Sequence, residues 1–239
     1  MEGLRVIGDP NEYAKRYHEA DELLYIDTVA SLYGRNNLSS IVERTSRDIF
    51  IPITVAGGIR SVEDVHQLFA SGADKVGVNT AAIRRPELIS EIANRYGSQA
   101  VTVSIEAKRT KDGWEAYTDC GRERTGRQVL GWIREAIDRG AGEILLTSVD
   151  QEGTLAGFDL ELIRTCAGSV PVPFVVSGGC GTVGHISEAL ESGADAVAVA
   201  SVLHYNKLTI GDIREHLESK FQNRRSQARG TETRSDSRV

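Results

Sequence analysis

The chain has 239 residues, of which 40% are hydrophobic and 26% are charged, and this is the composition of an ordinary globular protein. Its formal net charge of −6 excludes a general nucleic-acid-binding protein, because such proteins carry a basic face. No apolar run is long enough to span a membrane, and residues 1–22 lack the apolar centre of a signal peptide. We therefore expect a cytoplasmic protein with neither a membrane nor a nucleic acid as a partner.

Seven short apolar runs alternate with segments of helical periodicity along the chain. The runs are nearly continuous and rich in Val and Ile, which is typical of parallel strands buried on both faces. The alternation of strands and helices indicates an α/β fold with right-handed crossovers. The predicted strands span residues 23–26, 51–55, 75–78, 100–105, 143–147, 173–176 and 196–200.

Helical spacing of apolar residues marks two of the intervening segments, residues 62–69 and residues 130–137. Ser61 and Thr182 each stand directly before a segment of this kind, as helix-capping residues do. Between the fourth strand and the helix at 130–137, residues 112–121 (DGWEAYTDCG) predict a hairpin inserted in a loop.

An internal repeat relates the two halves of the chain. Without a gap, it pairs Gly57 with Gly178 and Gly72 with Gly193, a constant offset of 121 residues. The offset indicates two homologous halves of four strand–helix units each, and eight such units close a barrel. We predict a (β/α)₈ TIM-type barrel as a single domain over residues 1–221 and a disordered tail over 222–239. An open Rossmann sheet is less favoured, because no GxGxxG follows a first strand.

The same repeat predicts that the first strand of the barrel is lacking. The strand that contains Glu106 has no counterpart in the first half, because the matching position would fall before Met1. Either the strand is absent or residues 1–7 (MEGLRVI) partly substitute for it.

Turns made of small residues follow four of the predicted strands, at the barrel end where active sites lie. They are Gly57-Gly58, Asn79-Thr80, Ser177-Gly178-Gly179 and Ala200-Ser201. Backbone N–H groups in such turns can approach an anion closely. Their symmetric placement predicts two phosphate sites, one in each half, although glycines also serve simply to make tight turns.

Three carboxylates are expected at the same barrel mouth. Glu106 ends a strand and could act as a general acid or base, or could pair with Lys108 or Arg109. Asp27 also ends a strand, where it could equally cap the following turn. Glu152 lies in the loop that follows the fifth strand.

Neither a metal nor a cofactor is expected. The three cysteines, Cys120, Cys166 and Cys180, form no CxxC pair, and Cys180 is interpreted as a small filler of its turn. His185 and His204 have no ligand-like neighbours in the sequence.

At the opposite pole, charged residues begin two of the strands. They are Asp74 and Lys75 on one strand and Glu143 on another. Strand starts in a barrel usually concern stability, so this ring could be an ion-pair network or a docking face.

Longer motifs give the chain a family resemblance. AGGIRSVED, GADKVGVNTAA, YGSQAVTVSIEAKR, RGAGEILLTSVDQEGT, SGGCG and GADAVAVASVLH are similar to the cyclase subunit of imidazole glycerol phosphate synthase over nearly the whole chain up to the tail. The resemblance implies a lyase of histidine biosynthesis in a heterodimer with a glutaminase. Ammonia from that partner would cross the barrel and convert a phosphoribulosyl-formimino-aminoimidazole carboxamide ribonucleotide to imidazole glycerol phosphate and aminoimidazole carboxamide ribonucleotide.

The resemblance also implies roles for individual residues. Glu106 aligns with a catalytic carboxylate, and Glu152 and Ser177 belong to the substrate site. One phosphate would bind at Gly58, Asn79 and Thr80, and the other at Gly153, Gly179, Ala200 and Ser201. At the opposite pole, Lys75 and Glu143 match the ammonia gate, Asp74 matches a docking contact, and Gln99 lies near the ammonia path.

The chain departs from the family pattern at its acids. The family has Asp at positions 106 and 152 and a second catalytic Asp in the first strand. Glu reaches one methylene further, and a misplacement of about 1 Å can cost on the order of 10²-fold in rate. Two alternatives therefore stay open, a paralogue that channels ammonia to another acceptor, such as a surface sugar, and a catalytically impaired scaffold that activates a glutaminase.

Overall fold

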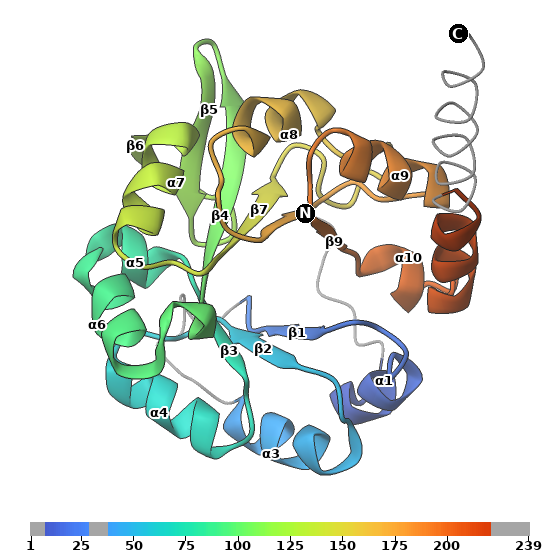
Figure 1. Cartoon of the computed structure of the whole chain (residues 1–239), viewed down its shortest axis with the longest axis horizontal. Helices are drawn as coiled ribbons and strands as arrows, with labels where there is room; N and C mark the ends of the chain where they lie inside the picture. The colour runs from blue at the N-terminus through green and yellow to red at the C-terminus, as the bar shows by residue number, and fades with distance from the viewer. Residues whose placement is uncertain (1–7, 29–37, 221–239) are drawn as a thin grey trace, which may run out of the picture.

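The structure, a computed structural model, describes residues 8–28 and 38–220. A single curled sheet stands at its centre and helices surround it (Figure 1). Seven strands pair in parallel in the order β1 (Leu23–Ile26), β2 (Ile53–Ala56), β3 (Lys75–Val78), β4 (Val101–Thr110), β7 (Glu143–Ser148), β8 (Phe174–Ser177) and β9 (Ala196–Ala198). The fold is a TIM-type (β/α) barrel, as the sequence predicted.

Helices lie between consecutive strands, as the crossover rule requires. They are α1 (Pro10–Arg16), α3 (Ser39–Asp48), α4 (Val62–Ala70), α5 (Thr80–Arg84), α6 (Glu87–Tyr96), α7 (Val129–Asp138), α8 (Leu160–Ala167), α9 (Val183–Glu191) and α10 (Ser201–His204). No helix in the described part of the chain has both the length and the apolar character needed to cross a membrane.

Strand β4 runs five residues further than predicted. Beyond Ile105 it pairs with the antiparallel strand β5 (Gly113–Thr118), which in turn pairs with β6 (Glu123–Gln128). This confirms the predicted hairpin, which projects beyond the ring of helices (Figure 1). The prediction ended β4 too early because it relied on a run of apolar residues. The strand continues because its backbone groups form hydrogen bonds with β5, and this pairing leaves no apolar pattern in the sequence.

Within residues 8–28 and 38–220, β1 and β9 each pair on one side only and not with each other. The predicted substitute strand at residues 1–7 and the predicted tail at 222–239 lie outside the described residues. The absence of a first strand and the domain boundaries therefore stay predictions.

The core lies on both faces of the parallel strands. Val76, Val103 and Ile144 are fully buried, as are helix residues such as Leu88 and Ile133. Each buried aliphatic side chain of this size stabilises the fold by about 1.5–3 kcal/mol. This packing is what holds the carboxyl ends of neighbouring strands at one common rim.

The two halves reproduce the repeat in their hydrogen bonds. The Asp74 carboxylate accepts the Ile53 N–H at 2.8 Å, and the Asp195 carboxylate accepts the Phe174 N–H at 2.9 Å. All four residues are related by the 121-residue offset seen between Gly57 and Gly178. Each half thus fastens the start of one strand to the start of the next in the same way.

The turns and helix starts of the two halves also match. Gly57 and Gly178 both have φ of +97°, and a side chain at either would collide with the backbone of the preceding strand end. Ser61 and Thr182 cap α4 and α9 through their hydroxyl oxygens, which confirms both predicted helix starts.

Candidate active site

Glu106 lies on β4 where the strand leaves the barrel, at the level of the carboxyl ends of its neighbours. Its Oε2 accepts a hydrogen bond from Asn79 Nδ2 at 3.1 Å and one from the Gly121 N–H at 2.9 Å. Asn79 follows β3 directly, and its amide also donates to the Tyr117 carbonyl oxygen at 3.3 Å. The carboxylate is therefore fixed by neutral donors from β3 and from the hairpin.

The surroundings of Glu106 favour its protonated form. Burial raises the pKa of Glu106 above its ordinary 4.5, and the hydrogen bonds from Gly121 and Asn79 oppose this only in part. The nearby charges of Asp119 and Glu152 raise the pKa further. A carboxyl group of this kind can hold and release a proton nearer to neutral pH than an exposed glutamate can.

The turn that supplies the Gly121 N–H has an unusual backbone. Asp119 and Cys120 both adopt positive φ, at +52° and +61°, which non-glycine residues seldom do. The turn also reaches β1, since Cys120 Sγ donates to the Thr28 carbonyl oxygen at 2.7 Å. Sequence reasoning placed a hairpin here but missed Gly121, because a backbone donor leaves no side-chain signal.

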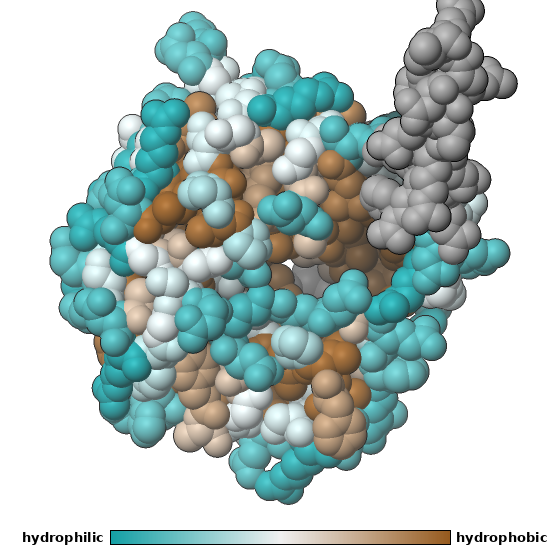
Figure 2. Space-filling view, viewed as in Figure 1, coloured by the Kyte–Doolittle hydropathy of each residue, from teal (hydrophilic) through white to brown (hydrophobic). Residues whose placement is uncertain are grey.

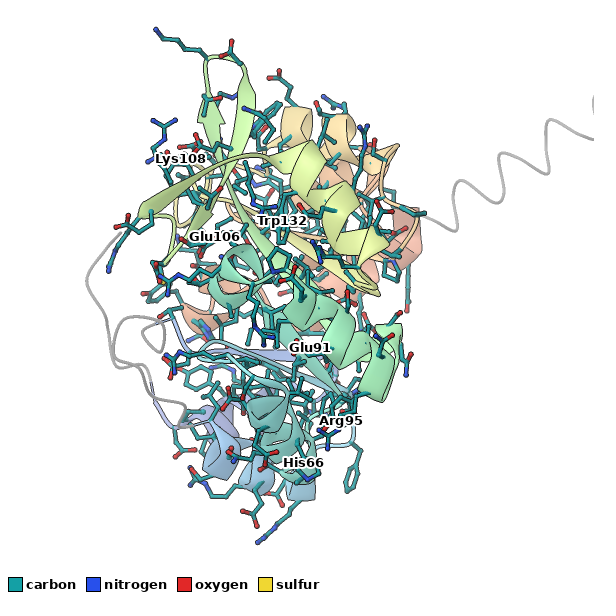
Figure 3. The ribbon with its side chains drawn as sticks, turned by 90° about the vertical axis from the view of Figure 1, so that its left-hand side faces the viewer. His66, Glu91, Arg95, Glu106, Lys108 and Trp132 are labelled. Atoms are coloured by element: carbon teal, nitrogen blue, oxygen red, sulfur yellow. The ribbon has the colours of Figure 1, made fainter. Side chains whose placement is uncertain are left out.

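The alternative that Glu106 pairs with Lys108 or Arg109 does not hold, because both side chains have other partners. Lys108 lies 5.4 Å from the centre of the Tyr117 ring, and Arg109 pairs with Glu161 at 2.6 Å. Lys108 follows Glu106 along β4 into the projecting hairpin (Figure 3). Strand periodicity puts Glu106 and Lys108 on one face of β4, but the lysine contacts the aromatic ring of Tyr117 on β5 instead.

Glu152 lies in the loop between β7 and α8, which spans residues 149–159. The residue as a whole is exposed, but its Oε2 lies against Gly178, 3.4 Å from where a β-carbon would be. The partial burial of this carboxyl group raises the pKa of Glu152. The loop also reaches the end of β8, because the Gly157 N–H donates to the Gly179 carbonyl oxygen at 2.7 Å.

The remaining predicted rim residues all lie just after strands, at the carboxyl end of the sheet. One set follows β2 and β3, which are neighbours, and consists of Gly58, Asn79 and Thr80. The other lies at the ends of β8 and β9 and in the β7–α8 loop, and consists of Ser177, Gly179, Ala200, Ser201 and Gly153. The molecular face in Figure 2 is hollowed near its centre, with apolar side chains along part of the hollow.

Asp27 lies at the same rim, at the end of β1. It follows β1 directly, and its backbone N–H donates to the Ala56 carbonyl oxygen at 2.9 Å. Asp27 therefore lies after β1, Glu106 on β4 and Glu152 in the loop after β7, and their common role at the mouth stays a prediction.

At the opposite pole, one lysine bridges two carboxylates. Lys75 Nζ lies 2.6 Å from Glu22 and 2.7 Å from Glu143, and the Thr102 hydroxyl donates to Glu143 at 2.9 Å. Burial lowers the pKa of Lys75, but the hydrogen bonds to Glu143 and Glu22 outweigh it and the pKa is raised. Sequence reasoning did not assign Glu22 to this site, although the repeat aligns it with Glu143.

The two other residues predicted at this pole have local roles in the structure. The Asp74 carboxylate accepts the Ile53 N–H, and the exposed Gln99 side chain donates to the Tyr96 carbonyl oxygen at 3.0 Å. Phe50, in the loop that leads into β2 at the same pole, is 92% exposed.

Among the described residues, no three side chains of His, Cys, Asp or Glu gather as a metal site would require. Cys180 is buried in its turn, and burial raises the pKa of its thiol to about 11. His185 Nδ1 accepts the Gly181 N–H at 3.1 Å, so its ring supports the glycine turn.

The barrel with carboxyl groups and small-residue turns on one rim defines a TIM-barrel enzyme. The model of the histidine biosynthesis protein family matches residues 1–209. Imidazole glycerol phosphate synthase subunit HisF from Legionella pneumophila is 62% identical over 184 residues, which cover 76% of this chain and 87% of that protein. Proteins of the same name from Mycobacteroides abscessus and Kineococcus radiotolerans are each 49% identical, over 90% of this chain and 87% and 88% of their own length. The chain belongs to the histidine biosynthesis protein family and is a homologue of HisF.

Proposed function

We propose that the chain is the cyclase subunit of an imidazole glycerol phosphate synthase. It would take ammonia from a glutaminase partner and convert the phosphoribulosyl-formimino-aminoimidazole carboxamide ribonucleotide to imidazole glycerol phosphate and aminoimidazole carboxamide ribonucleotide. The observation that carries the proposal is Glu106, a partly buried acid held by neutral donors at a rim that also bears small-residue turns from both halves. The identity of 46–62% to curated HisF proteins supports the same activity.

Glu106 would move protons in this reaction. When ammonia adds to an electrophilic carbon, the nitrogen must lose protons and a leaving nitrogen must gain one. A carboxyl group with a raised pKa can do both in turn, which contributes typically 10²–10⁴-fold to a rate. Asn79 and Gly121 would keep its reactive oxygen in place, while the charge of Glu152 on the β7–α8 loop helps to raise its pKa.

The two sets of small-residue turns would hold the ends of the substrate. Each set presents backbone N–H groups at a strand end, where a phosphate oxygen can approach closely because no bulky side chain intervenes. A substrate with two phosphates would span the rim from β2 and β3 to β8 and β9, above Glu106 on β4. This placement would bring its central carbons near the acid.

The opposite pole would receive the glutaminase. Lys75 holds two carboxylates that would otherwise repel each other at the centre of the barrel floor. Such a cluster could admit a small neutral molecule such as ammonia while it blocks ions. Asp74 and Phe50 lie near this floor and would contact the partner.

The direct test supplies the purified chain with the ribonucleotide substrate and a high concentration of ammonium salt, without a glutaminase. We expect both products by liquid chromatography and mass spectrometry, because ammonia in solution bypasses the partner. The Glu106→Gln variant should form far less product, and Glu63→Gln, which makes the same chemical change at an exposed carboxylate on α4, is its control. No product in spite of demonstrated substrate binding would contradict the proposal.

A paralogue with another ammonia acceptor is the second candidate, and the longer acid at position 106 favours it. Glu in place of the family's Asp moves the carboxyl group outward by about one bond, which suits a differently placed reacting carbon. In that case substrate would bind without turnover, and the chain would still stimulate its glutaminase. Restoration of turnover by Glu106→Asp would separate an ill-placed acid from a different acceptor.

A further inference from the structure

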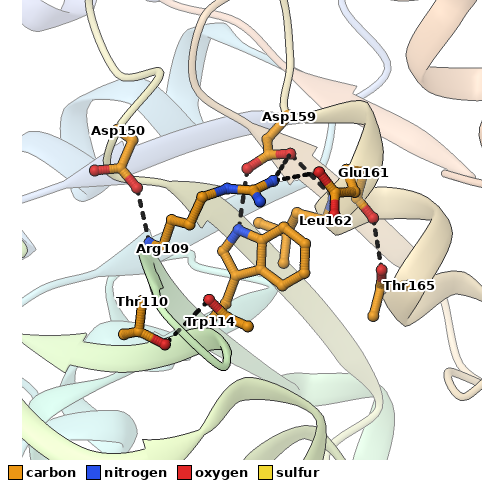
Figure 4. Close-up of polar contacts among 9 residues, drawn as sticks. Arg109, Thr110, Trp114, Asp150, Asp159, Glu161, Leu162 and Thr165 are labelled. Carbon is orange, nitrogen blue, oxygen red and sulfur yellow. Dashed lines mark hydrogen bonds and ion pairs between the residues drawn. The ribbon is translucent and has the colours of Figure 1, made fainter.

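The β4–β5 hairpin contacts the β7–α8 loop at both ends of that loop. At the near end, the Val149 N–H donates to the Ala107 carbonyl oxygen at 2.8 Å, and the Arg109 N–H donates to the Asp150 carboxylate at 2.8 Å. At the far end, Trp114 Nε1 donates to Asp159 Oδ2 at 3.0 Å (Figure 4). The segment between these contacts carries Glu152 and Gly153, the loop's two proposed contributions to the mouth.

Asp159 is a junction between three elements. While Oδ2 accepts from the Trp114 indole, Oδ1 accepts the Leu162 N–H at 3.0 Å and so caps α8. The Arg109 guanidinium group lies over the Trp114 ring, 4.4 Å from its centre, and pairs with Glu161 (Figure 4). These contacts link the hairpin, the end of the loop and the start of α8.

The bond from Trp114 to Asp159 is strong for its kind. The indole is only 7% exposed and its acceptor is a carboxylate, and hydrogen bonds to charged groups are worth more than neutral ones. Between its ends the loop is also held by the Gly157 N–H, which donates to the Gly179 carbonyl oxygen at 2.7 Å, while Glu152, Gly153 and Thr154 are all exposed. The position of this exposed segment at the mouth therefore depends on Gly157 and on the contacts at the two ends of the loop.

We propose that Trp114 is a positioning residue, which acts through Asp159 to hold the β7–α8 loop, and with it Glu152 and Gly153, over the phosphorylated substrate. The structural part of the inference stands on the contacts alone, and its kinetic part rests on the proposed function. Trp114 itself does not touch the reacting atoms, because it lies on the outer hairpin beyond the mouth.

The chain offers a matched pair of variants as the test. Trp114→Phe keeps an aromatic ring beneath Arg109 and removes the indole N–H. Trp132→Phe is the control, because Trp132 also has an arginine over its ring, Arg127 at 4.8 Å, but its buried Nε1 has no hydrogen-bond partner to lose. Both variants lose the indole N–H, and only Trp114→Phe loses a hydrogen bond with it.

The first measurement is amide hydrogen exchange of residues 150–157 in the full chain. We expect exchange on the order of tenfold faster in Trp114→Phe and near the wild-type rate in Trp132→Phe, because only the first frees the loop end. Equal exchange in the two variants would overturn the inference. This readout needs no turnover, so it stays informative even if the proposed reaction fails.

The second measurement is the ammonium-dependent reaction. We expect Trp114→Phe to raise KM for the ribonucleotide several-fold with little change in kcat, because the loop binds the substrate. A loss of folded protein alone would lower kcat and leave KM unchanged, which would reduce Trp114 to a structural residue. Glu161→Gln, which removes only the exposed ion pair of Arg109, is expected to leave KM unchanged.

Discussion

The two poles of the barrel hold glutamate side chains in different electrostatic surroundings. At the mouth, Glu106 is bound by an amide and a backbone N–H, and its pKa is raised by burial. At the opposite pole, Glu22 and Glu143 share the ammonium group of Lys75. No cation lies within ion-pair distance of Glu106 among residues 8–28 and 38–220. The buried Glu106 carboxyl group, without a cation, can exchange a proton nearer to neutral pH, whereas Glu22 and Glu143 are held in place by the ion pairs with Lys75.

The largest effect is expected from Glu106→Gln. The amide oxygen can still accept the hydrogen bonds from Asn79 and Gly121, but the amide cannot exchange a proton, so ammonium-dependent turnover should fall by on the order of 10²–10⁴-fold. Substrate binding, measured by calorimetry, should change little, because the phosphate turns are untouched. Retention of more than a tenth of the turnover would show that the difference between the two poles has no catalytic meaning.

Removal of the cation tests the other pole. Lys75→Met leaves Glu22 and Glu143 facing each other in a partly buried cluster, in which the side chains of Lys75, Glu143 and Glu22 are 17%, 15% and 32% exposed. Loss of one partner from such a cluster should lower the free energy of unfolding by about 3 kcal/mol. Urea denaturation measures this, and Lys15→Met, which removes an exposed lysine from α1, is the control with little expected loss.

A smaller effect is expected at the pole that would bind the glutaminase, where a substitution should change the affinity for this partner and not the reaction. Phe50→Ala removes an aromatic side chain that is 92% exposed, and we expect about a tenfold weaker affinity for the cognate glutaminase. The ammonium-dependent reaction should be unaffected, because it does not need the partner. Tyr205→Ala, at an exposed aromatic that follows α10, should leave the affinity unchanged. Surface plasmon resonance with immobilised glutaminase measures both variants.

The smallest effect is a pH dependence of stability. A carboxyl group with a raised folded-state pKa contributes stability below its unfolded pKa of about 4.5, and this contribution is lost as the pH rises through the folded-state pKa. Glu106→Gln should therefore melt at a higher temperature than the wild type at pH 7. The difference should shrink as the pH falls towards 4.5, and calorimetric scans across pH 4–8 measure it. A variant that is less stable at pH 7 would contradict the raised pKa.

The sequence predicted the parts of the fold that repeat and the parts that are apolar. Strands 23–26 and 75–78 were predicted with their observed bounds, and Ser61 and Thr182 begin helices because their hydroxyl groups satisfy orphan N–H groups. Hydrogen bonds from backbone groups to the site residues could not be predicted in this way. The Gly121 N–H reaches Glu106 only because the chain turns back after β5.

Side-chain partners on different strands could also not be predicted from the sequence. Lys108 was a plausible partner for Glu106 by strand period, but its ammonium group lies over the ring of Tyr117, which is opposite Glu106 on the antiparallel β5. Glu22 was aligned with Glu143 by the repeat, and the structure adds that one lysine serves both. Such pairs depend on three-dimensional register, which a single sequence does not specify.

Lys75 has a consequence for the symmetry of the molecule. Its counterpart in the second half, 121 residues on, is Ala196, while Glu22 and Glu143 are counterparts of each other. Lys75 of the first half therefore neutralises an equivalent acid from each half, so a second half cut from the chain would keep Glu143 but lose this cation. The two repeats are joined across the barrel axis by a position at which they differ, and this difference makes the second half depend on the first.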